Sequence, residues 1–318
     1  MKRKWSGLIG LFLLLCLTAC SGNTSSDKTV LRIGEQEIGR AEYLVYLYTT
    51  SKSFEAAAGE DVWGMDFDGQ SADQLVEERT INTLQSVIAA EDYAAANDIS
   101  LTEAEKEQAR LAAEQFLSGI SQEDMDKIQV DADRLTALME ASYLYTLVHQ
   151  SIAEECQVDA GEKAAYYQEQ KEILREEYTT LHLQSVLVDQ EETAEEVAEE
   201  ARAGEDFAAL FAAYDKEPDA ENGGKVSMYQ GELQTQFGLP EDLRVGDIYG
   251  PIERSNGYFV LHIMAKEIPT EERVKELAES IYTADVQTAY TEARFAEMIK
   301  SQTVEKVAEN WDTLETFH

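Results

Sequence analysis

Proline is scarce in this chain of 318 residues, and its distribution is uneven. The only four prolines lie between Pro218 and Pro269, and eight of the eighteen glycines lie between Gly204 and Gly257. Proline restricts φ and glycine frees it, so a block rich in both is typical of tight turns. The stretch 178–267 is therefore predicted to differ in architecture from the rest of the chain.

Cysteine is also scarce, with three in the whole chain. Cys16 and Cys20 lie in or beside an amino-terminal apolar run, which leaves Cys156 without a partner for an intramolecular disulfide. Packing must then supply the stability of the fold. Cys156 occurs in a helical context and is predicted to be a buried small hydrophobe rather than a nucleophile.

Basic residues are few: 26 Lys and Arg stand against 63 Asp and Glu, for a formal net charge of −37. Such a field repels nucleic acid and anionic lipid and keeps a protein soluble. Nucleic-acid partners are excluded on this ground. The charge favours basic or unfolded polypeptides as partners.

The first residues have the pattern of an export signal. Lys2, Arg3 and Lys4 precede an apolar run from residue 8 to 17, which is too short for a comfortable membrane span. The following Leu-Thr-Ala-Cys resembles the lipobox of bacterial lipoproteins, which implies a signal peptide over 1–19, lipidation of Cys20 and a flexible tether over 20–29. The alternative is an ordinary signal peptide with an unrelated cysteine. With the lipobox, the protein would be extracytoplasmic and anchored to the cell membrane.

Most of the remaining chain has a helical pattern. A short hairpin is predicted around Gly34, followed by a helix from about Arg40, and Thr102 with Glu105 has the spacing of a capping box. Apolar residues at steps of three and four predict further amphipathic helices over 71–97, 102–120, 131–156, 160–175 and 272–300. The last helix and the tail to residue 318 cannot form a core alone, so they are expected to dock on residues 30–175.

The block from 178 to 267 has the pattern of a small βα sheet. A strand over 181–188 is followed by a helix over 191–203, a Gly223-Gly224 turn, a Gly250-Pro251 turn and a strand over 257–263. This order and spacing resemble the parvulin family of peptidyl-prolyl isomerases. The matching motifs are Gly204-Glu205-Asp206-Phe207, Gly223-Gly224, Gly246-Asp247, Gly250-Pro251 and Gly257-Tyr258.

With the lipobox and the flanking helices, the whole chain is similar to the PrsA-like (SurA-like) foldase lipoproteins. The resemblance implies an α+β fold, in which a discontinuous all-helical chaperone domain carries an inserted parvulin-like α/β domain. The implied boundaries are 30–176 for the first helical part, 177–268 for the parvulin-like domain and 269–318 for the returning helix and tail.

The resemblance also implies a set of site residues. Isomerisation requires an apolar cup for the proline ring and a twisted amide that has lost its resonance. Counted from the Gly-Gly turn, the cup of the family maps onto Val226, Leu233 and Phe237, with Gln234 beside them. The alternative is that these are ordinary core residues.

The polar positions of the family are changed in this chain. Ser185 and Phe259 stand where parvulins carry histidines, and the family's Asp or Cys falls at Asp215 or at the neighbouring Lys216. His182 and His262 lie an odd number of residues away along their strands, which points them to the opposite face of the sheet. Isomerase activity is therefore expected to be reduced or absent.

No other chemistry is indicated. The four histidines form no pair with metal-ligand spacing, and the Gly-Lys after the turn is followed by Val226, which excludes a phosphate loop. Neither a metal nor a cofactor is expected. The predicted function is that of an anchored foldase that binds unfolded secreted polypeptides and their proline-containing segments. The alternative is a non-catalytic scaffold or binding lipoprotein with one specific partner.

Overall fold

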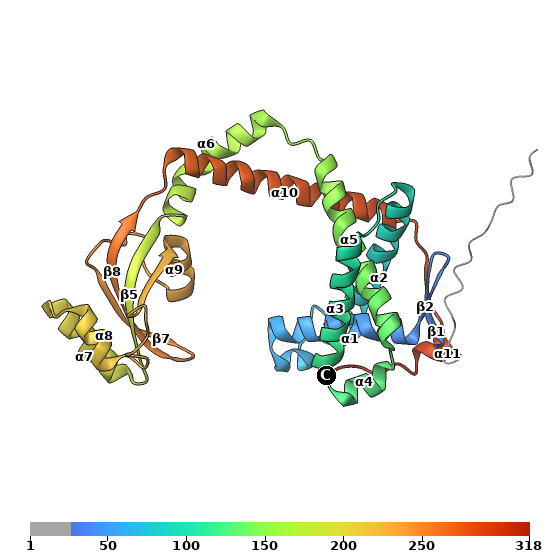
Figure 1. Ribbon diagram of the computed structural model, residues 1–318, viewed down its shortest axis with the longest axis horizontal. Helices are drawn as coiled ribbons and strands as arrows, with labels where there is room; N and C mark the ends of the chain where they lie inside the picture. Colours follow the sequence, from blue (N-terminus) through green and yellow to red (C-terminus); the bar gives the residue numbers. More distant parts are fainter. Residues whose placement is uncertain (1–26) are drawn as a thin grey trace, which may run out of the picture. The chain divides into compact units, whose positions relative to one another are not determined.

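The computed structural model describes residues 27–318 (Figure 1). The predicted signal peptide, Cys20 and most of the tether lie outside this range. The described chain forms two compact units. Unit 1 comprises the residues up to Ile152 together with Glu292–His318, and unit 2 comprises Ala153–Thr291.

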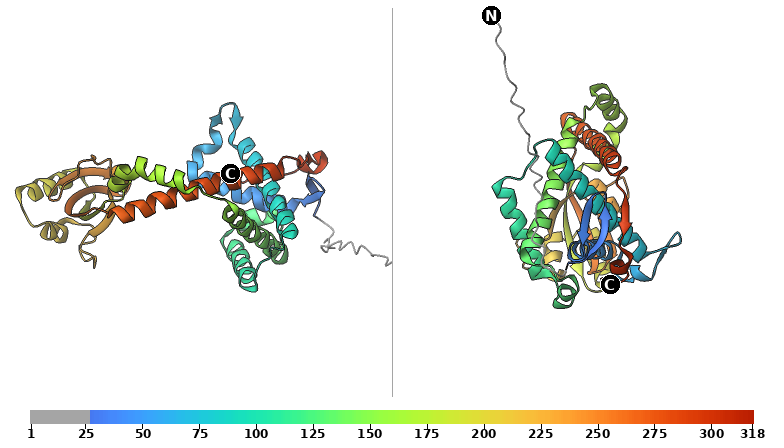
Figure 2. Two further views of the ribbon diagram at one scale, coloured as in Figure 1. Left: turned by 90° about the horizontal axis from the view of Figure 1, so that it is seen from above. Right: turned by 90° about the vertical axis from the view of Figure 1, so that its right-hand side faces the viewer.

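Unit 1 begins with the predicted hairpin, formed by β1 (Thr29–Ile33) and β2 (Gln36–Gly39). A third strand, β9 (Val304–Lys306), pairs antiparallel with β1, so the order of the sheet is β2-β1-β9. Figure 2 (right) shows this late segment beside the amino-terminal hairpin. The tail thus pairs with the early chain through β9.

The rest of unit 1 is largely helical. The hydroxyl of Thr102 accepts from the backbone N–H of Glu105, and the Glu105 carboxylate accepts from the backbone N–H of Thr102, which confirms the predicted capping box. The core of unit 1 contains Tyr43, Leu44 and Leu84, each at most 1% exposed. The elements are α1 (Arg40–Ala58), η1 (Glu60–Gly64), β3 (Asp66–Phe67), β4 (Gln70–Ser71), α2 (Ala72–Ala96), α3 (Glu103–Gly119), α4 (Gln122–Ile128), most of α5 (Ala132–Glu155) and α11 (Ala308–Trp311).

Unit 2 contains an antiparallel four-stranded sheet in the order β6-β5-β8-β7. The strands are β5 (Thr180–Val188), β6 (Lys225–Tyr229), β7 (Ile248–Arg254) and β8 (Gly257–Glu267). The helices are α6 (Ala160–Glu177), α7 (Glu191–Ala203), α8 (Phe207–Tyr214), α9 (Gln230–Phe237) and the first part of α10 (Glu271–Ile299).

Each face of this sheet has its own apolar cluster. Val186 and Val260 pack against residues of α7 and α8, whereas Leu183 and Leu261 pack with Leu233 of α9. Alternation along β5 and β8 sends neighbouring side chains to opposite faces. Figure 1 shows α7 and α8 on one side of the strands and α9 on the other.

A separate pair of helices completes unit 2. Tyr167 and Leu174 of α6 pack against Val274 and Ala278 of α10. Contacts therefore group α6 and the first part of α10 with the sheet. The predicted domain boundaries at 177 and 268 mark where the inserted segment begins and ends in the sequence, and they differ from the limits of unit 2. These boundaries stay a prediction.

Two further features bear on the sequence predictions. Cys156, predicted to be buried, is only half-buried just beyond the end of α5, with Sγ 4.0 Å from the carbonyl oxygen of Val286. Among residues 27–318, no helix combines the length and the apolar character that a membrane span requires.

Candidate functional site

Helix α9 supplies three of the four residues predicted for the proline cup, and Gln230 fixes its first turn. Gln230 is 1% exposed, and its Nε2 donates to the carbonyl of Glu241 at 2.8 Å and to Glu176 Oε1 at 3.1 Å. Its Oε1 accepts from Lys266 Nζ at 2.9 Å. A buried amide satisfied on both sides holds the helix in one position on the sheet.

Leu233 and Phe237 lie next to the sheet face defined by Leu183 and Leu261. Leu233 is fully buried, and Phe237 is partly buried against the same cluster. The ring of Phe237 meets that of Phe259 at right angles, with 5.6 Å between centroids. The structure thus brings together two predicted cup residues and one position at which parvulins carry histidine.

Gln234 contributes a polar group beside these rings. Its Nε2 is buried and has no hydrogen-bond partner. Buried amide donors are nearly always satisfied, so this one is an exception, and a ligand oxygen would reach it only after the side chain turned toward the surface. The carbonyl of an X-Pro amide is a ligand of that kind.

Val226 differs from the other predicted cup residues. It lies on the edge strand β6 opposite Leu183, and its side chain is 41% exposed. In this structure it does not join the buried cluster of Leu233. The apolar surface therefore has a buried part on α9 and an exposed part on β6.

Ser185 and Phe259 lie on the same face of the sheet as Leu183 and Leu261. Ser185 pairs with Leu261 across the β5–β8 ladder. The hydroxyl of Ser185 donates to the carbonyl of Gly224 at 3.2 Å, and its backbone N–H donates to the same oxygen at 2.9 Å. At Ser185, the side chain supports the Gly-Gly turn and supplies no imidazole.

The two nearby histidines do not replace the missing pair. His262 lies on the other face, where its ring centroid is 5.3 Å from that of Phe207 in α8. His182 pairs with Ser227, and its Nδ1 lies 2.7 Å from the Ser227 hydroxyl. The structure confirms that His262 is directed away from the Phe237 ring.

Asp215 has a structural set of partners. One carboxylate oxygen accepts from the backbone N–H of Leu187 at 2.7 Å, and the other accepts from the N–H of Glu217 at 2.8 Å. The neighbouring Lys216 donates to the carbonyl of Asn256 at 2.6 Å and forms an ion pair with Asp189. These contacts join the end of α8 to the strands of the sheet.

Arg254 was not identified from the sequence. Its guanidinium carbon lies 5.1 Å from the centroid of the Phe237 ring, a cation–π contact. Among the described residues it forms no ion pair, and it donates a hydrogen bond to the carbonyl of Glu253 at 2.8 Å. No local signal could have shown this contact, because the β7–β8 hairpin brings Arg254 to α9 from a distant part of the chain.

The chemistry available at this face is binding rather than proton transfer. It offers apolar and aromatic surface, one unmet amide donor and one guanidinium. Nearby, burial and a hydrogen bond to Asp247 raise the pKa of Tyr249 to about 12, so that phenol stays neutral. Within residues 27–318, no cluster of three or more His, Cys, Asp or Glu residues could hold a metal ion.

Both this sheet and the chain around it are similar to known proteins. Residues 184–265 match the rotamase family described as the PPIC-type PPIase domain. The chain is 25% identical over 325 residues to the foldase protein PrsA of Caldanaerobacter subterraneus subsp. tengcongensis, covering 98% of each chain. It is also 25% identical over 287 residues to PrsA of Halalkalibacterium halodurans, covering 88% of this chain and 78% of that protein.

Solved structures give more distant matches. The crystal structure of foldase protein PrsA from Streptococcus pneumoniae has a TM-score of 0.47 at 16% identity, over 74% of this chain and 92% of that one. A SurA-like chaperone of Campylobacter jejuni has a TM-score of 0.38 at 12% identity, over 88% of this chain and 99% of that one.

Proposed function

We propose that this chain, a PrsA-like protein with a PPIC-type peptidyl-prolyl isomerase domain, is an extracytoplasmic foldase that holds unfolded secreted polypeptides. The observation that carries the proposal is the match to one PrsA foldase over 98% of both chains, with the PPIC-type domain inside it. A match of this length includes the helical parts as well as the sheet. The proposal therefore concerns both units.

The sheet unit is proposed to bind proline-containing segments and to isomerise them weakly or not at all. Leu233, Phe237 and Phe259 provide an apolar face, and the buried Gln234 amide would provide a donor for a client carbonyl once its side chain turned toward the surface. Catalysis requires contacts that are stronger in the twisted transition state than in the ground state. Ser185 and Phe259 replace the imidazoles that the parvulin family places here, so little differential stabilisation is expected.

The location proposed for the protein follows from its first residues. The lipobox-like sequence ending at Cys20 would attach the chain to the outer face of the cell membrane through lipid. Such an anchor holds a foldase where secreted chains emerge. Metabolic labelling with a fatty-acid analogue would test it: label on the natural chain and its loss in Cys20→Ala are expected, and equal label on both would contradict the anchor.

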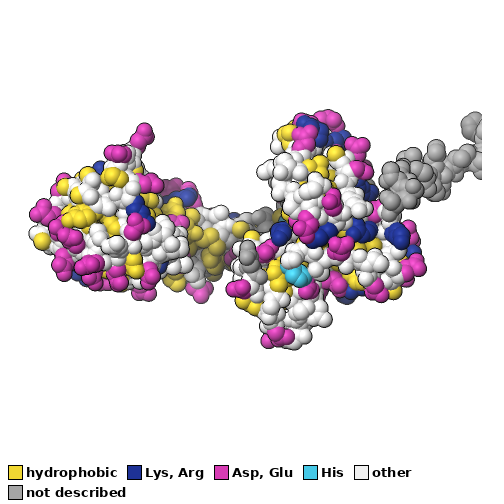
Figure 3. Space-filling model, turned by 90° about the horizontal axis from the view of Figure 1, so that it is seen from below, with side chains coloured by type: hydrophobic (Ala, Val, Ile, Leu, Met, Phe, Trp, Pro, Cys, Tyr) yellow, Lys and Arg dark blue, Asp and Glu magenta, His cyan; other side chains and the backbone are white. Residues whose placement is uncertain are grey.

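Client breadth is the direct test of the proposed function. The chain carries a formal net charge of −37, and Figure 3 shows acidic side chains spread over the visible face of each unit. We expect suppression of aggregation for several unrelated unfolded proteins at equimolar ratio, most strongly for basic ones. An acidic, well-folded lipoprotein of similar size is the control.

A different result would contradict the proposed foldase function. If aggregation of every unfolded protein proceeds unchanged and pull-downs recover one stoichiometric partner, the chain is a binding scaffold rather than a foldase.

A further inference from the structure

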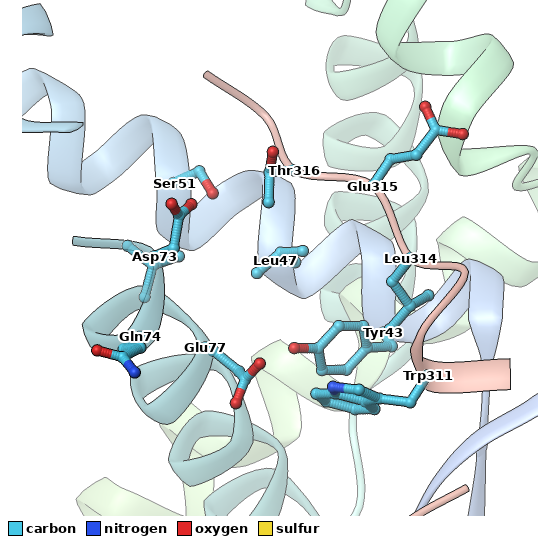
Figure 4. Close-up of a pocket in the computed structure, with 11 residues that line it drawn as sticks. Tyr43, Leu47, Ser51, Asp73, Gln74, Glu77, Trp311, Leu314, Glu315 and Thr316 are labelled. Atoms are coloured by element: carbon cyan, nitrogen blue, oxygen red, sulfur yellow. The ribbon is translucent and has the colours of Figure 1, made fainter. Parts of the chain in front are cut away.

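Unit 1 contains a small hollow that none of the features above explains. It lies between one stripe of α1, the first turn of α2 and the segment from Trp311 to Thr316, as Figure 4 shows. Its volume is about 170 Å³, below the roughly 300–1,000 Å³ of small-molecule and cofactor sites. The hollow therefore suits a single side chain.

Two largely buried residues present hydroxyl groups to this hollow. Tyr43 is 1% exposed and Ser51 is 2% exposed, yet neither hydroxyl has a hydrogen-bond partner among the described residues. Both residues line the hollow, and Figure 4 shows the Tyr43 hydroxyl directed to the side where Glu77 lies. The little surface that these two side chains expose includes their oxygens, which open into the hollow and bond to no other residue, so each is available to a polar ligand group.

The charges around the hollow define the sign of that ligand. Asp73, Glu77 and Glu315 contribute carboxylates to its lining. Glu77 forms an ion pair with Lys306, and Asp73 lies 3.4 Å from a His318 ring nitrogen that is charged only when protonated. Glu315 forms no ion pair within the described part of the chain. The lining thus retains an excess of negative charge.

Apolar and aromatic groups complete the lining. Leu47, Val76 and Leu314 present aliphatic surface, and the rings of Tyr43 and Trp311 lie 4.8 Å apart between centroids. Lys306 Nζ already lies 4.6 Å from the Trp311 ring, which shows that this ring accepts a cation. Aliphatic walls beside carboxylates and hydroxyl oxygens match an ammonium or guanidinium carried on a methylene stem.

We propose that this hollow binds a lysine or arginine side chain of a client polypeptide. The methylene stem would pack on Leu47 and Leu314, and the charged end would donate to the Tyr43 hydroxyl oxygen and to the carboxylates of Asp73 and Glu315. The site would give the helical unit a preference for basic segments, separate from the apolar face of the sheet unit. The proposal rests on the proposed role in client binding.

A peptide titration tests this site. The probes are a blocked pentapeptide with one central lysine among glycines and the same peptide with norleucine, which keeps the stem and removes the charge. Binding is followed by NMR at the indole N–H of Trp311. The lysine peptide is expected to bind at least about tenfold more tightly than the norleucine peptide, and less tightly at high salt.

Variants of the protein locate the contact. Tyr43→Phe keeps the ring against Trp311 and removes the hydroxyl, and Glu315→Gln removes one carboxylate on the exposed tail. Each should weaken binding about fivefold or more, because a hydrogen bond or charge contact to the cation is lost. Asp312→Asn is the matched control, with the same change of charge three residues away and outside the lining. It should leave the affinity within about twofold.

Thermal unfolding of each variant shows whether the fold is kept. The proposal is overturned if norleucine and lysine peptides bind equally, if Tyr43→Phe and Glu315→Gln, still folded, leave the affinity unchanged, or if a divalent cation alone shifts Trp311 while the peptide does not. Because the readout is one short peptide at unit 1, failure here leaves the aggregation test of the proposed function intact.

Discussion

Leu233 and Val226 show how two residues with the same predicted role differ in their surroundings. Leu233 is fully buried in the cluster on α9, whereas Val226 is 41% exposed on an edge strand. Spacing from the Gly-Gly turn could assign both to a cup, but it could not give their burial. Burial at β6 depends on pairing with β5, which is more than thirty residues away in sequence.

Truncation of these two side chains should therefore have different effects on stability. Leu233→Ala is expected to lower the free energy of unfolding of unit 2 by about 2–5 kcal/mol, since it removes buried methyl groups and leaves a cavity. Val226→Ala should cost about 0.5 kcal/mol or less. Hydrogen exchange of the β8 amides in urea measures both, and equal losses would show that Val226 is buried as deeply as Leu233.

The carboxyl group of Glu42 lies in a poorly solvated place. Its side chain is 15% exposed beside Arg134, and burial raises its pKa more than the guanidinium lowers it. A carboxyl with a raised pKa contributes most stability below its unfolded pKa of about 4.3, and that contribution is lost as the pH rises through the folded pKa. Ionisation of Glu42 thus weakens unit 1.

The variant Glu42→Gln removes this ionisation. Relative to the natural chain, its free energy of unfolding should rise as the pH increases from about 4 through the raised folded pKa of Glu42, and then level off. The fluorescence of Trp63 and Trp311, both in unit 1, follows unfolding. Glu103→Gln is the control, because Lys106 lowers the pKa of the exposed Glu103 and the difference should stay flat or fall. A constant difference for Glu42→Gln across this range would argue against the burial effect.

Elements defined by a local pattern could be predicted from the sequence, and elements that depend on distant partners could not. The capping boxes at Ser71 and Thr102 and the strand β5 are local features, and local patterns are enough to find them. The short strand β9 was not predicted, because three exposed residues have no pattern of their own until they pair with β1. The contact of Arg254 with Phe237 was missed for the same reason.

In the Gly223-Gly224 turn, the two glycines serve different purposes. Both have positive φ, but an added Cβ at Gly223 would meet nothing within 4 Å. At Gly224 it would lie 2.4 Å from the carbonyl oxygen of Ser185 and 2.6 Å from the ring of Phe211. The backbone of Gly224 thus packs directly against β5.

Alanine substitution should separate the two positions. Gly223→Ala is expected to cost about 1 kcal/mol, the usual penalty for a left-handed residue with a Cβ. Gly224→Ala should cost more than about 3 kcal/mol, because strain and a backbone clash add. Urea-dependent hydrogen exchange of β5 amides measures both variants. Similar losses at the two sites would mean that the turn relaxes around Gly224.

We propose that the whole molecule binds clients through two kinds of surface, one in each unit. The sheet unit offers an apolar face at α9 with an unmet amide donor, and the helical unit offers an acidic hollow with two unmet hydroxyls. Composition predicted the acidic character and the periodicities predicted the helices. The hollow could not be predicted, since it forms from α1, α2 and a tail more than two hundred residues away.

The central claim is that the PPIC-type domain keeps a proline-binding face and has lost most of its catalytic power. The most direct measurement is a protease-coupled isomerisation assay of an X-Pro peptide with the natural chain and with Phe237→Ala. For both proteins we expect a rate within about twofold of the uncatalysed reaction, which takes tens of seconds or more. A rate well above that background with the natural chain, which falls in Phe237→Ala, would contradict it.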